Sequence, residues 1–234
     1  MGTFVINKDQ EIVLNTAEGV FVPTGTTKEL IKAVSSYVKK PGKLLDLGCG
    51  SGAVGLALHQ SGVVESPLYA SDISQHAVDC LGRNASLNHC SVVPRCGSLF
   101  DPWENEKFDY IVDDVAGVAQ EIAAISPWYN NVPCASGVDG TRLVCKMIEE
   151  APQYLNPQGL LFFPVISFSN IQIILKTAQD HFSHLEKLSH AEWPLPKEMY
   201  AHVDLLKRLQ AENQIEYIEK FGMVLYFSDV YVAY

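Results

Sequence analysis

Apolar runs of four to seven residues recur along the chain and alternate with segments in which apolar residues are spaced as on one face of a helix. The runs predict strands near residues 44–47, 68–72, 91–94, 108–112, 159–165, 185 and 223–233. The intervening segments predict helices near residues 28–38, 53–58, 76–88, 137–154 and 171–181. Strands that alternate with helices in this way predict a doubly wound α/β fold.

The N-terminal residues follow a different pattern. Residues 4–22 alternate between apolar and polar side chains, which predicts a β-hairpin with a turn at residues 7–10 and a second turn at residues 17–19. Thr26 or Thr27 is expected to cap the helix that follows. The expected organisation is a single domain over residues 1–234, in which residues 1–26 form the hairpin and a segment that closes over a cofactor.

Two later segments are too long to be simple connections. These are residues 117–135 and residues 190–220, and segments of this kind usually carry recognition. We expect the second to be an insertion that forms a lid or contacts the substrate. Leu205, Leu206 and Leu209 lie on one face of its amphipathic part, which indicates either packing against the domain or the face of a homodimer.

The most informative segment is residues 46–52, which read Asp-Leu-Gly-Cys-Gly-Ser-Gly directly after an apolar run. A buried strand that ends on a glycine turn lets a ligand approach the backbone closely, and a nucleoside cofactor is the expected occupant. Residues 50–55 also fit the G-x-G-x-x-G pattern of dinucleotide binding. Asp46 favours S-adenosylmethionine instead, because its sulfonium and ammonium groups are cationic whereas a pyrophosphate would be repelled by the carboxylate.

Acidic residues also lie at the ends of the predicted strands near residues 68–72 and 108–112. Asp72 follows the run at 68–71 and is expected to accept hydrogen bonds from both ribose hydroxyls, although a turn or helix-capping aspartate would look the same. Asp113 and Asp114 end the strand at 108–112. Asp114 is expected to orient or deprotonate the acceptor, and Asp113 to raise its pKa through like-charge repulsion. The alternative is that one of the two ends the strand as a turn residue while the other is solvated.

Aromatic side chains in the two long segments are candidates for the wall of an acceptor pocket. They are Trp128 and Tyr129 in the first segment and Trp193 in the second, although packing alone explains them equally well. No metal site is expected, because no His, Cys, Asp or Glu cluster shows a defensible set of ligands.

Charge and cysteine content narrow the setting. The 234 residues carry a net charge of −10, and the 17 Lys and Arg residues are scattered, which argues against a nucleic-acid substrate. No apolar stretch is long enough to cross a bilayer. The six cysteines show no paired spacing, so reduced thiols in a cytoplasmic protein are expected. A small molecule or a peptide therefore remains as the acceptor.

Several motifs in order resemble one known family. Val-Pro at residues 22–23, the glycine turn, residues 97–102, residues 108–112 and residues 137–140 resemble the HemK/PrmC-type glutamine N-methyltransferases and their small-domain relatives. The resemblance covers roughly residues 12 to 166. It implies the class I methyltransferase fold, which is a Rossmann-like seven-stranded sheet with its last strand antiparallel, and S-adenosylmethionine as the cofactor.

The resemblance also implies roles for individual residues. Asp46, Gly48 and Gly50, with the adjacent Gly52, would meet the methionine part of the cofactor. Asp72 and Ile73 would lie at its ribose. Ser98 and Leu99 would flank the adenine, and Thr27 would close over the cofactor. Asp114 would also contact the cofactor, on the side of the acceptor.

The chain departs from this family where the acceptor binds. The family has Asn-Pro-Pro-Tyr after its fourth strand, whereas this chain has Asp-Val-Ala-Gly at residues 114–117, so a glutamine amide is not the expected acceptor. The sequence thus predicts an S-adenosylmethionine-dependent enzyme that methylates a nitrogen or oxygen of a small molecule. A HemK-type protein methyltransferase, a non-catalytic cofactor-binding subunit and an NAD-dependent oxidoreductase remain as alternatives.

Overall fold

The computed structural model describes residues 2–8, 10–132 and 134–234. Its strands are β1 (Gly2–Asn7), β2 (Gln10–Leu14), β3 (Leu44–Leu47), β4 (Leu68–Asp72), β5 (Val92–Cys96), β6 (Phe108–Asp113), β7 (Leu155–Ile166), β8 (Leu185–Pro194), β9 (Ile218–Lys220) and β10 (Met223–Ala233). Its helices are α1 (Gly25–Tyr37), α2 (Ala53–Gln60), α3 (Gln75–Leu87), α4 (Gln120–Ile125), α5 (Arg142–Glu150), α6 (Ile171–His181) and α7 (Val203–Ala211), with 3-10 turns η1 (Asp101–Trp103), η2 (Pro127–Tyr129), η3 (Ala151–Gln153) and η4 (Lys197–His202).

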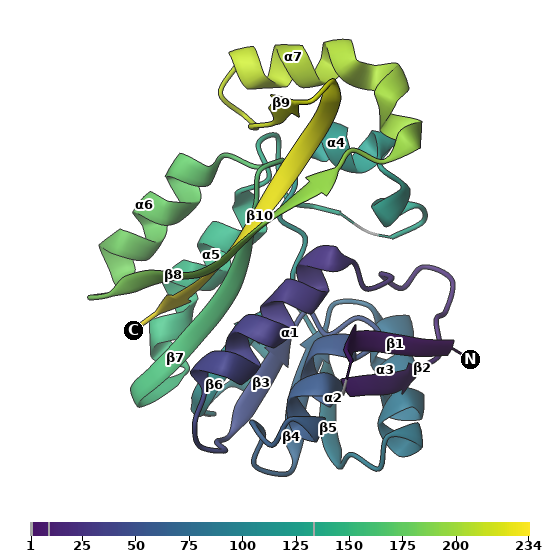
Figure 1. Cartoon of the computed structure of the whole chain (residues 1–234). Helices are drawn as coiled ribbons and strands as arrows, with labels where there is room; N and C mark the ends of the chain where they lie inside the picture. Colours follow the sequence, from purple (N-terminus) through teal and green to yellow (C-terminus); the bar gives the residue numbers. More distant parts are fainter. Residues whose placement is uncertain (1, 9, 133) are drawn as a thin grey trace.

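The central sheet has the strand order β5-β4-β3-β6-β7-β10-β8 (Figure 1). The strands from β5 to β7 are parallel, and β10 runs antiparallel to both of its neighbours. The predicted α/β fold with an antiparallel last strand is confirmed. A short strand, β9, pairs with the start of β10 and adds an eighth strand that the sequence did not predict.

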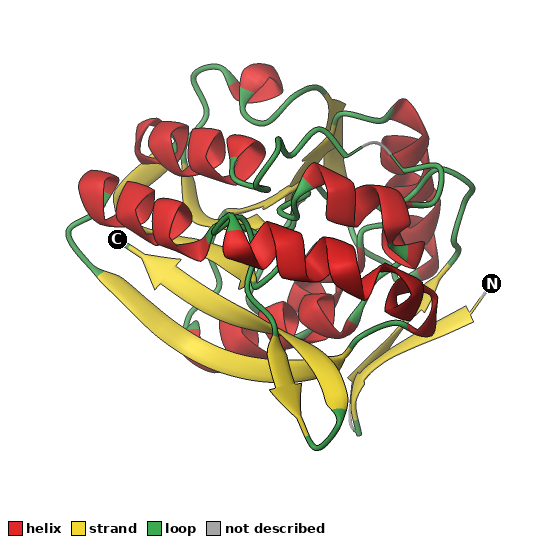
Figure 2. Ribbon diagram, turned by 90° about the horizontal axis from the view of Figure 1, so that it is seen from above, coloured by secondary structure: helices red, strands yellow, loops and turns green. Residues whose placement is uncertain are grey.

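Helices cover both faces of this sheet (Figures 1 and 2). Neighbouring residues of β3 point to opposite faces: Leu44 packs with apolar residues of α1 and α2, and Leu45 packs with those of α5 and α6. Because both faces are covered, the parallel strands are largely apolar, which is the pattern that identified them in the sequence.

A third apolar cluster forms a cap above the carboxyl ends of the strands, where Figure 1 shows α4, α7 and β9. Leu206 and Leu209 of α7 are fully buried in it, together with Phe168 and Met199. Their apolar face therefore packs against the chain itself. The expected insertion at residues 190–220 begins too early, because its first residues, up to Pro194, belong to β8 and pair with β10.

The N-terminal hairpin is confirmed as β1 paired with β2, separate from the central sheet. One residue of its predicted turn at 7–10, Asp9, lies outside the described residues. The second turn is present, with the Val20 amide donating to the Ala17 carbonyl. Helix α1 begins at Gly25, three residues earlier than predicted, and its cap position is Thr24, because the Thr27 hydroxyl accepts from the Thr24 amide across the first turn.

Helix α5, in contrast, begins later than predicted, at Arg142. The segment before it turns through Gly137 and Gly140, both at positive φ. Within the part of the chain that the structure describes, no helix is long and apolar enough to cross a membrane.

Candidate functional site

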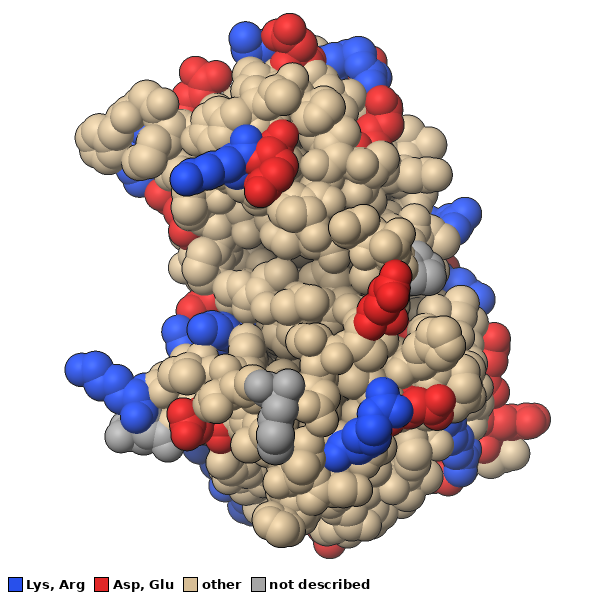
Figure 3. Space-filling model, turned by 90° about the vertical axis from the view of Figure 1, so that its right-hand side faces the viewer, with Lys and Arg blue, Asp and Glu red and all other residues tan. Residues whose placement is uncertain are grey.

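A pocket opens at the carboxyl ends of β3, β4 and β6, with about 1190 Å³ of empty space including its mouth. Figure 3 shows the hollowed waist of the molecule, where few charged side chains are visible. The pocket lies where the strand order reverses direction, which is the usual ligand position in this class of sheet. The predicted residues that line it are Thr27, Gly48, Gly50, Asp72, Ile73, Ser98, Leu99, Asp114 and Tyr129.

The glycine turn after β3 forms the floor of the pocket. The amides of Gly48 and Cys49 both donate to the Ser71 carbonyl at 2.9 Å, which holds the turn against β4. A Cβ at Gly48 would lie 2.7 Å from the Val115 side chain, so this glycine is needed for packing. Gly50 lines the pocket at φ +49°, a conformation that favours glycine, and a Cβ built there would come into ordinary contact with Phe21, whose carbonyl would lie 3.9 Å away.

Gly52 does not line the pocket. A Cβ there would lie 2.4 Å from Leu81 of α3, and the residue has φ +87°. Its predicted contact with the cofactor is replaced by close packing of α3 against the start of α2.

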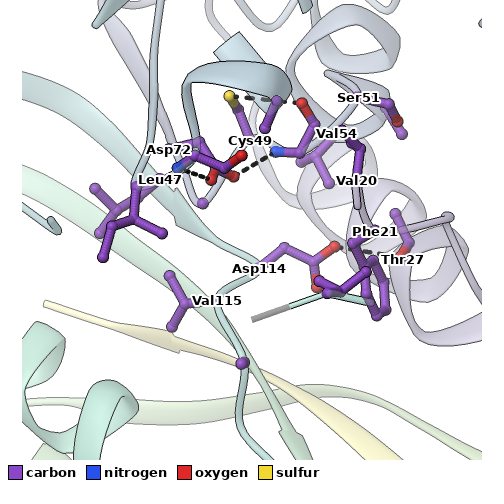
Figure 4. Close-up of a pocket in the computed structure, with 18 of the residues that line it drawn as sticks. Val20, Phe21, Thr27, Leu47, Cys49, Ser51, Val54, Asp72, Asp114 and Val115 are labelled. Carbon is purple, nitrogen blue, oxygen red and sulfur yellow. Dashed lines mark hydrogen bonds between the residues drawn. The ribbon is translucent and has the colours of Figure 1, made fainter. Parts of the chain in front are cut away.

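Asp72 lies in the pocket at the end of β4 and joins two backbone segments. One carboxylate oxygen accepts from the Gly50 amide at 2.9 Å, and the other accepts from the Ser74 amide at 2.9 Å (Figure 4). Asp72 thus holds the glycine turn and the start of α3 while its carboxylate still faces the pocket. The sequence predicted Asp72 either as a turn aspartate or as a pocket residue, and its position fits both.

Asp46 is fully buried below the turn and is absent from the pocket lining. Its Oδ2 accepts from the Gly55 amide at 2.9 Å, while Oδ1 has no hydrogen-bond partner among the described residues. Burial, with a smaller contribution from Asp72, raises the pKa of Asp46 to about 7. A Cβ at residue 55 would lie 2.7 Å from Oδ2, so Gly55 makes room for this carboxylate.

Asp114 stands half-buried on the opposite wall, just after β6 (Figure 4). The Thr27 hydroxyl donates to its Oδ2 at 3.2 Å and itself accepts from the Thr24 amide at 3.1 Å. Burial, with a smaller contribution from Asp46, raises the pKa of Asp114 to about 7, and the Thr27 bond opposes the shift. A carboxyl group with this pKa is suited to accept a proton at neutral pH.

Asp113 points away from the pocket into the interior. It is buried, and its Oδ1 accepts from the Val115 amide at 3.2 Å. Burial raises its pKa well above the usual range, and Asp114 and Asp46 add to the shift. Asp113 therefore shapes the turn after β6 and does not line the pocket, and the like-charge interaction expected to raise the pKa of Asp114 raises that of Asp113 instead.

Two aromatic rings meet beside Asp114. Phe21, in the segment that follows the hairpin, packs against Tyr129 with ring centroids 5.5 Å apart. Trp128 and Trp193 do not line the pocket. Trp128 packs against Phe168 and Tyr226 in the cap, and the Trp193 indole donates to the Ser228 hydroxyl at 2.9 Å. Their expected role as walls of the acceptor pocket is replaced by packing.

The adenine end of the expected site is apolar. Ile73 is 67% exposed although it lines the pocket, and Leu99 lies beside it at φ +45° in the turn that follows β5. An exposed isoleucine on a pocket wall offers a flat apolar surface to a ring. Sequence reasoning missed Phe21, Val115, Ala116 and Leu143, which line the same pocket; their apolar character alone does not separate them from core residues.

The charge of the pocket fits a cationic cofactor. Among the described lining residues, Asp72 and Asp114 are acidic and none is Lys, Arg or His. A pyrophosphate would meet two carboxylates without a compensating cation, whereas a sulfonium and an ammonium group would be attracted. Within the described residues there is also no group of His, Cys, Asp and Glu that could hold a metal ion.

Comparison with known proteins finds methyltransferases, in agreement with a pocket that fits S-adenosylmethionine. The family model "Methyltransferase small domain" matches residues 11–114. A ribosomal protein L11 methyltransferase of Staphylococcus epidermidis is 31% identical over 164 residues, which cover 67% of this chain and 49% of the relative. A release factor glutamine methyltransferase of Thermodesulfovibrio yellowstonii is 29% identical over 164 residues, covering 66% and 58%. The chain spans about half the length of the curated relatives it matches.

Solved structures share the fold. A T. thermophilus 16S rRNA methyltransferase in complex with AdoMet and guanosine aligns with a TM-score of 0.62 at 16% identity, covering 99% of this chain and 50% of that one. A ribosomal protein L11 methylase from Lactobacillus delbrueckii aligns with a TM-score of 0.53 at 16% identity, covering 87% and 77%. Because these relatives and neighbours are named for protein and RNA substrates, they do not support the exclusion of nucleic acid that the net charge predicted.

Proposed function

We propose that this chain, whose residues 11–114 match the methyltransferase small-domain family, transfers a methyl group from S-adenosylmethionine to a nitrogen or oxygen atom of a small molecule. The observation that carries this proposal is Asp114, a carboxyl group with a pKa of about 7 on the pocket wall, where the related family has its asparagine.

Residues of the pocket divide between cofactor and acceptor. Gly48, Gly50 and Asp72 would hold the cofactor on the side of β3 and β4, with Ile73, Ser98 and Leu99 at its adenine. Asp114, Thr27, Phe21 and Tyr129 would face the acceptor. When bound, S-adenosylmethionine supplies a methyl carbon that its sulfonium already activates, so the protein mainly aligns the acceptor and excludes water.

Asp114 would take the proton that the acceptor loses. Thr27 occupies one carboxylate oxygen by donating to it, which orients the carboxylate and leaves the second oxygen available to the acceptor. When the acceptor receives the methyl group from the bound cofactor, the N–H or O–H proton that the acceptor loses would pass to Asp114. The protonated carboxyl group then returns the proton to solvent through the pocket mouth.

We favour a small acceptor because two segments of the chain enclose the acceptor end of the pocket. Residues 19–21, 23 and 24 line one side and Tyr129 and Val132 line another, so the acceptor end is walled by two separate segments. A protein or peptide side chain is the second candidate, favoured by relatives whose names give protein substrates. A cofactor-binding subunit without activity is the third.

The test compares Asp114→Asn with Asp79→Asn, an exposed aspartate of α3 that serves as the matched control. S-adenosylhomocysteine affinity is measured by calorimetry, and turnover by transfer of labelled methyl groups to fractionated metabolites and to fractionated protein. We expect Asp114→Asn to keep cofactor affinity and to lose about 10²–10⁴-fold in turnover. Wild-type turnover in that variant would refute the base role, and label found only in protein would favour the second candidate.

Cofactor identity is tested separately by thermal shift. S-adenosylhomocysteine at about 100 Kd should stabilise the protein by about 2.7 kcal/mol, and NAD should not. Stabilisation by NAD alone would overturn the proposal.

A further inference from the structure

The segment that covers the pocket is held by two asparagines of one helix. Asn84 and Asn88 lie one turn apart on and just after α3 and face the free edge of β2. The side-chain oxygen of Asn88 accepts from the Val13 backbone amide at 3.0 Å, and its side-chain nitrogen donates to the Val13 carbonyl at 2.8 Å. Asn84 does the same with Asn15, accepting at 2.8 Å and donating at 3.1 Å.

These contacts replace a neighbouring strand. Residues four apart on a helix are separated by about 6 Å along its axis, and residues two apart on a strand by about 6.6 Å. Asn84 and Asn88 therefore match Val13 and Asn15, whose backbone groups point to the same side. The Cys80 thiol donates to the Asn15 carbonyl at 3.2 Å and adds a third point of attachment.

Asn84 makes one contact that Asn88 lacks. Its amide nitrogen also donates to the carbonyl of Ser51 at 2.8 Å, inside the glycine turn. Asn84 is fully buried, and its bond to Ser51 is shielded from water. The Asn84 side chain thus ties the glycine turn to residue 15. The strap, residues 15–24, begins at that residue, and five of its residues line the pocket: Gly19, Val20, Phe21, Pro23 and Thr24.

We infer that Asn84 is a positioning residue for cofactor binding: it fixes the distance between the glycine turn and the strap over the pocket without touching the cofactor. This inference rests on the proposed function. The strap reaches Gly50 from above, since the Phe21 carbonyl lies 3.9 Å from a Cβ built at Gly50. Loss of the Asn84 bridge would therefore release both walls of the same space.

Asn88 supplies the matched control. Asn84→Asp removes the donors to Ser51 and Asn15, whereas Asn88→Asp removes the donors to Val13 and to the Asn84 carbonyl and leaves the glycine turn untouched. Thermal unfolding, proteolysis of residues 15–24 and S-adenosylhomocysteine affinity are measured for both. We expect faster proteolysis in both variants, a loss of affinity of at least about 10-fold in Asn84→Asp, and a loss below about 3-fold in Asn88→Asp.

Equal affinity losses in the two variants, or none in Asn84→Asp, would overturn the inference while the proposed function stood. If Asn84→Asp does not fold, Asn84→Ser removes the same donors, and also the acceptor of the Asn15 amide, without placing a charge in the interior, and it is judged by the same criterion. Failure of the wild-type protein to bind S-adenosylhomocysteine would instead refute the proposed function itself.

Discussion

Replacement of Asp46 by asparagine should stabilise the protein above neutral pH. The carboxyl group is fully buried, and burial raises its pKa from 3.8 to about 7. A carboxyl group whose pKa is higher in the folded state stabilises the fold below its unfolded pKa, and this stability is lost as the pH rises through the folded value. Each pKa unit corresponds to about 1.36 kcal/mol, so the ionised group costs about 4 kcal/mol at pH 8.

Asparagine avoids this cost and keeps the shape. Its amide oxygen can accept from the Gly55 amide, as Oδ2 of Asp46 does. For a domain of this size about 4 kcal/mol raises the melting temperature by about 8–16 °C. The assay is thermal unfolding of wild type and Asp46→Asn between pH 4 and pH 8.5, without cofactor. The difference in melting temperature between the two proteins should increase with rising pH and vanish near pH 4. An equal or lower melting temperature for Asp46→Asn at pH 8 would refute the reasoning.

Two further predictions concern the neighbours of this residue and the cofactor. Gly55→Ala should destabilise the protein by about 1–3 kcal/mol, because the new Cβ would lie 2.7 Å from both Asp46 Oδ2 and Leu68; chemical denaturation measures this, and an unchanged midpoint would mean that α2 can shift at no cost. Asp72→Ala should weaken S-adenosylhomocysteine binding at least about 10-fold, because it frees the Gly50 amide as well as removing the carboxylate from the pocket; an identical calorimetric titration would assign the ribose to another residue.

The sequence was sufficient for the architecture because buried parallel strands are largely apolar and end in recognisable turns. It could not separate the glycines of the turn by role. Gly50 faces the pocket, whereas Gly52 packs against Leu81 and Gly55 against Asp46, and all three satisfy one spacing pattern. Which neighbour a missing side chain makes room for depends on contacts from α3 and β4 that lie far along the chain.

Aromatic residues show the same limit. Tyr129 lines the pocket and the adjacent Trp128 packs in the cap, because successive residues of a short turn point in different directions. Phe21 was missed since one apolar residue in an irregular segment carries no periodic signal. The asparagine pair on α3 has the spacing of a helical face, but only the position of β2 shows what that face holds.

The place of β10 in the sheet has a consequence for how the chain reaches its native state. β8 is bonded to the sheet through β10, which is made some thirty residues later and lies between β8 and β7. During synthesis on the ribosome, β8 can therefore find no partner until residues 223–233 emerge. Until then β7, with its buried residues Phe162 and Phe163, presents an open apolar edge that other chains could join. A stalled chain that lacks β10 should thus depend on chaperones to remain in solution.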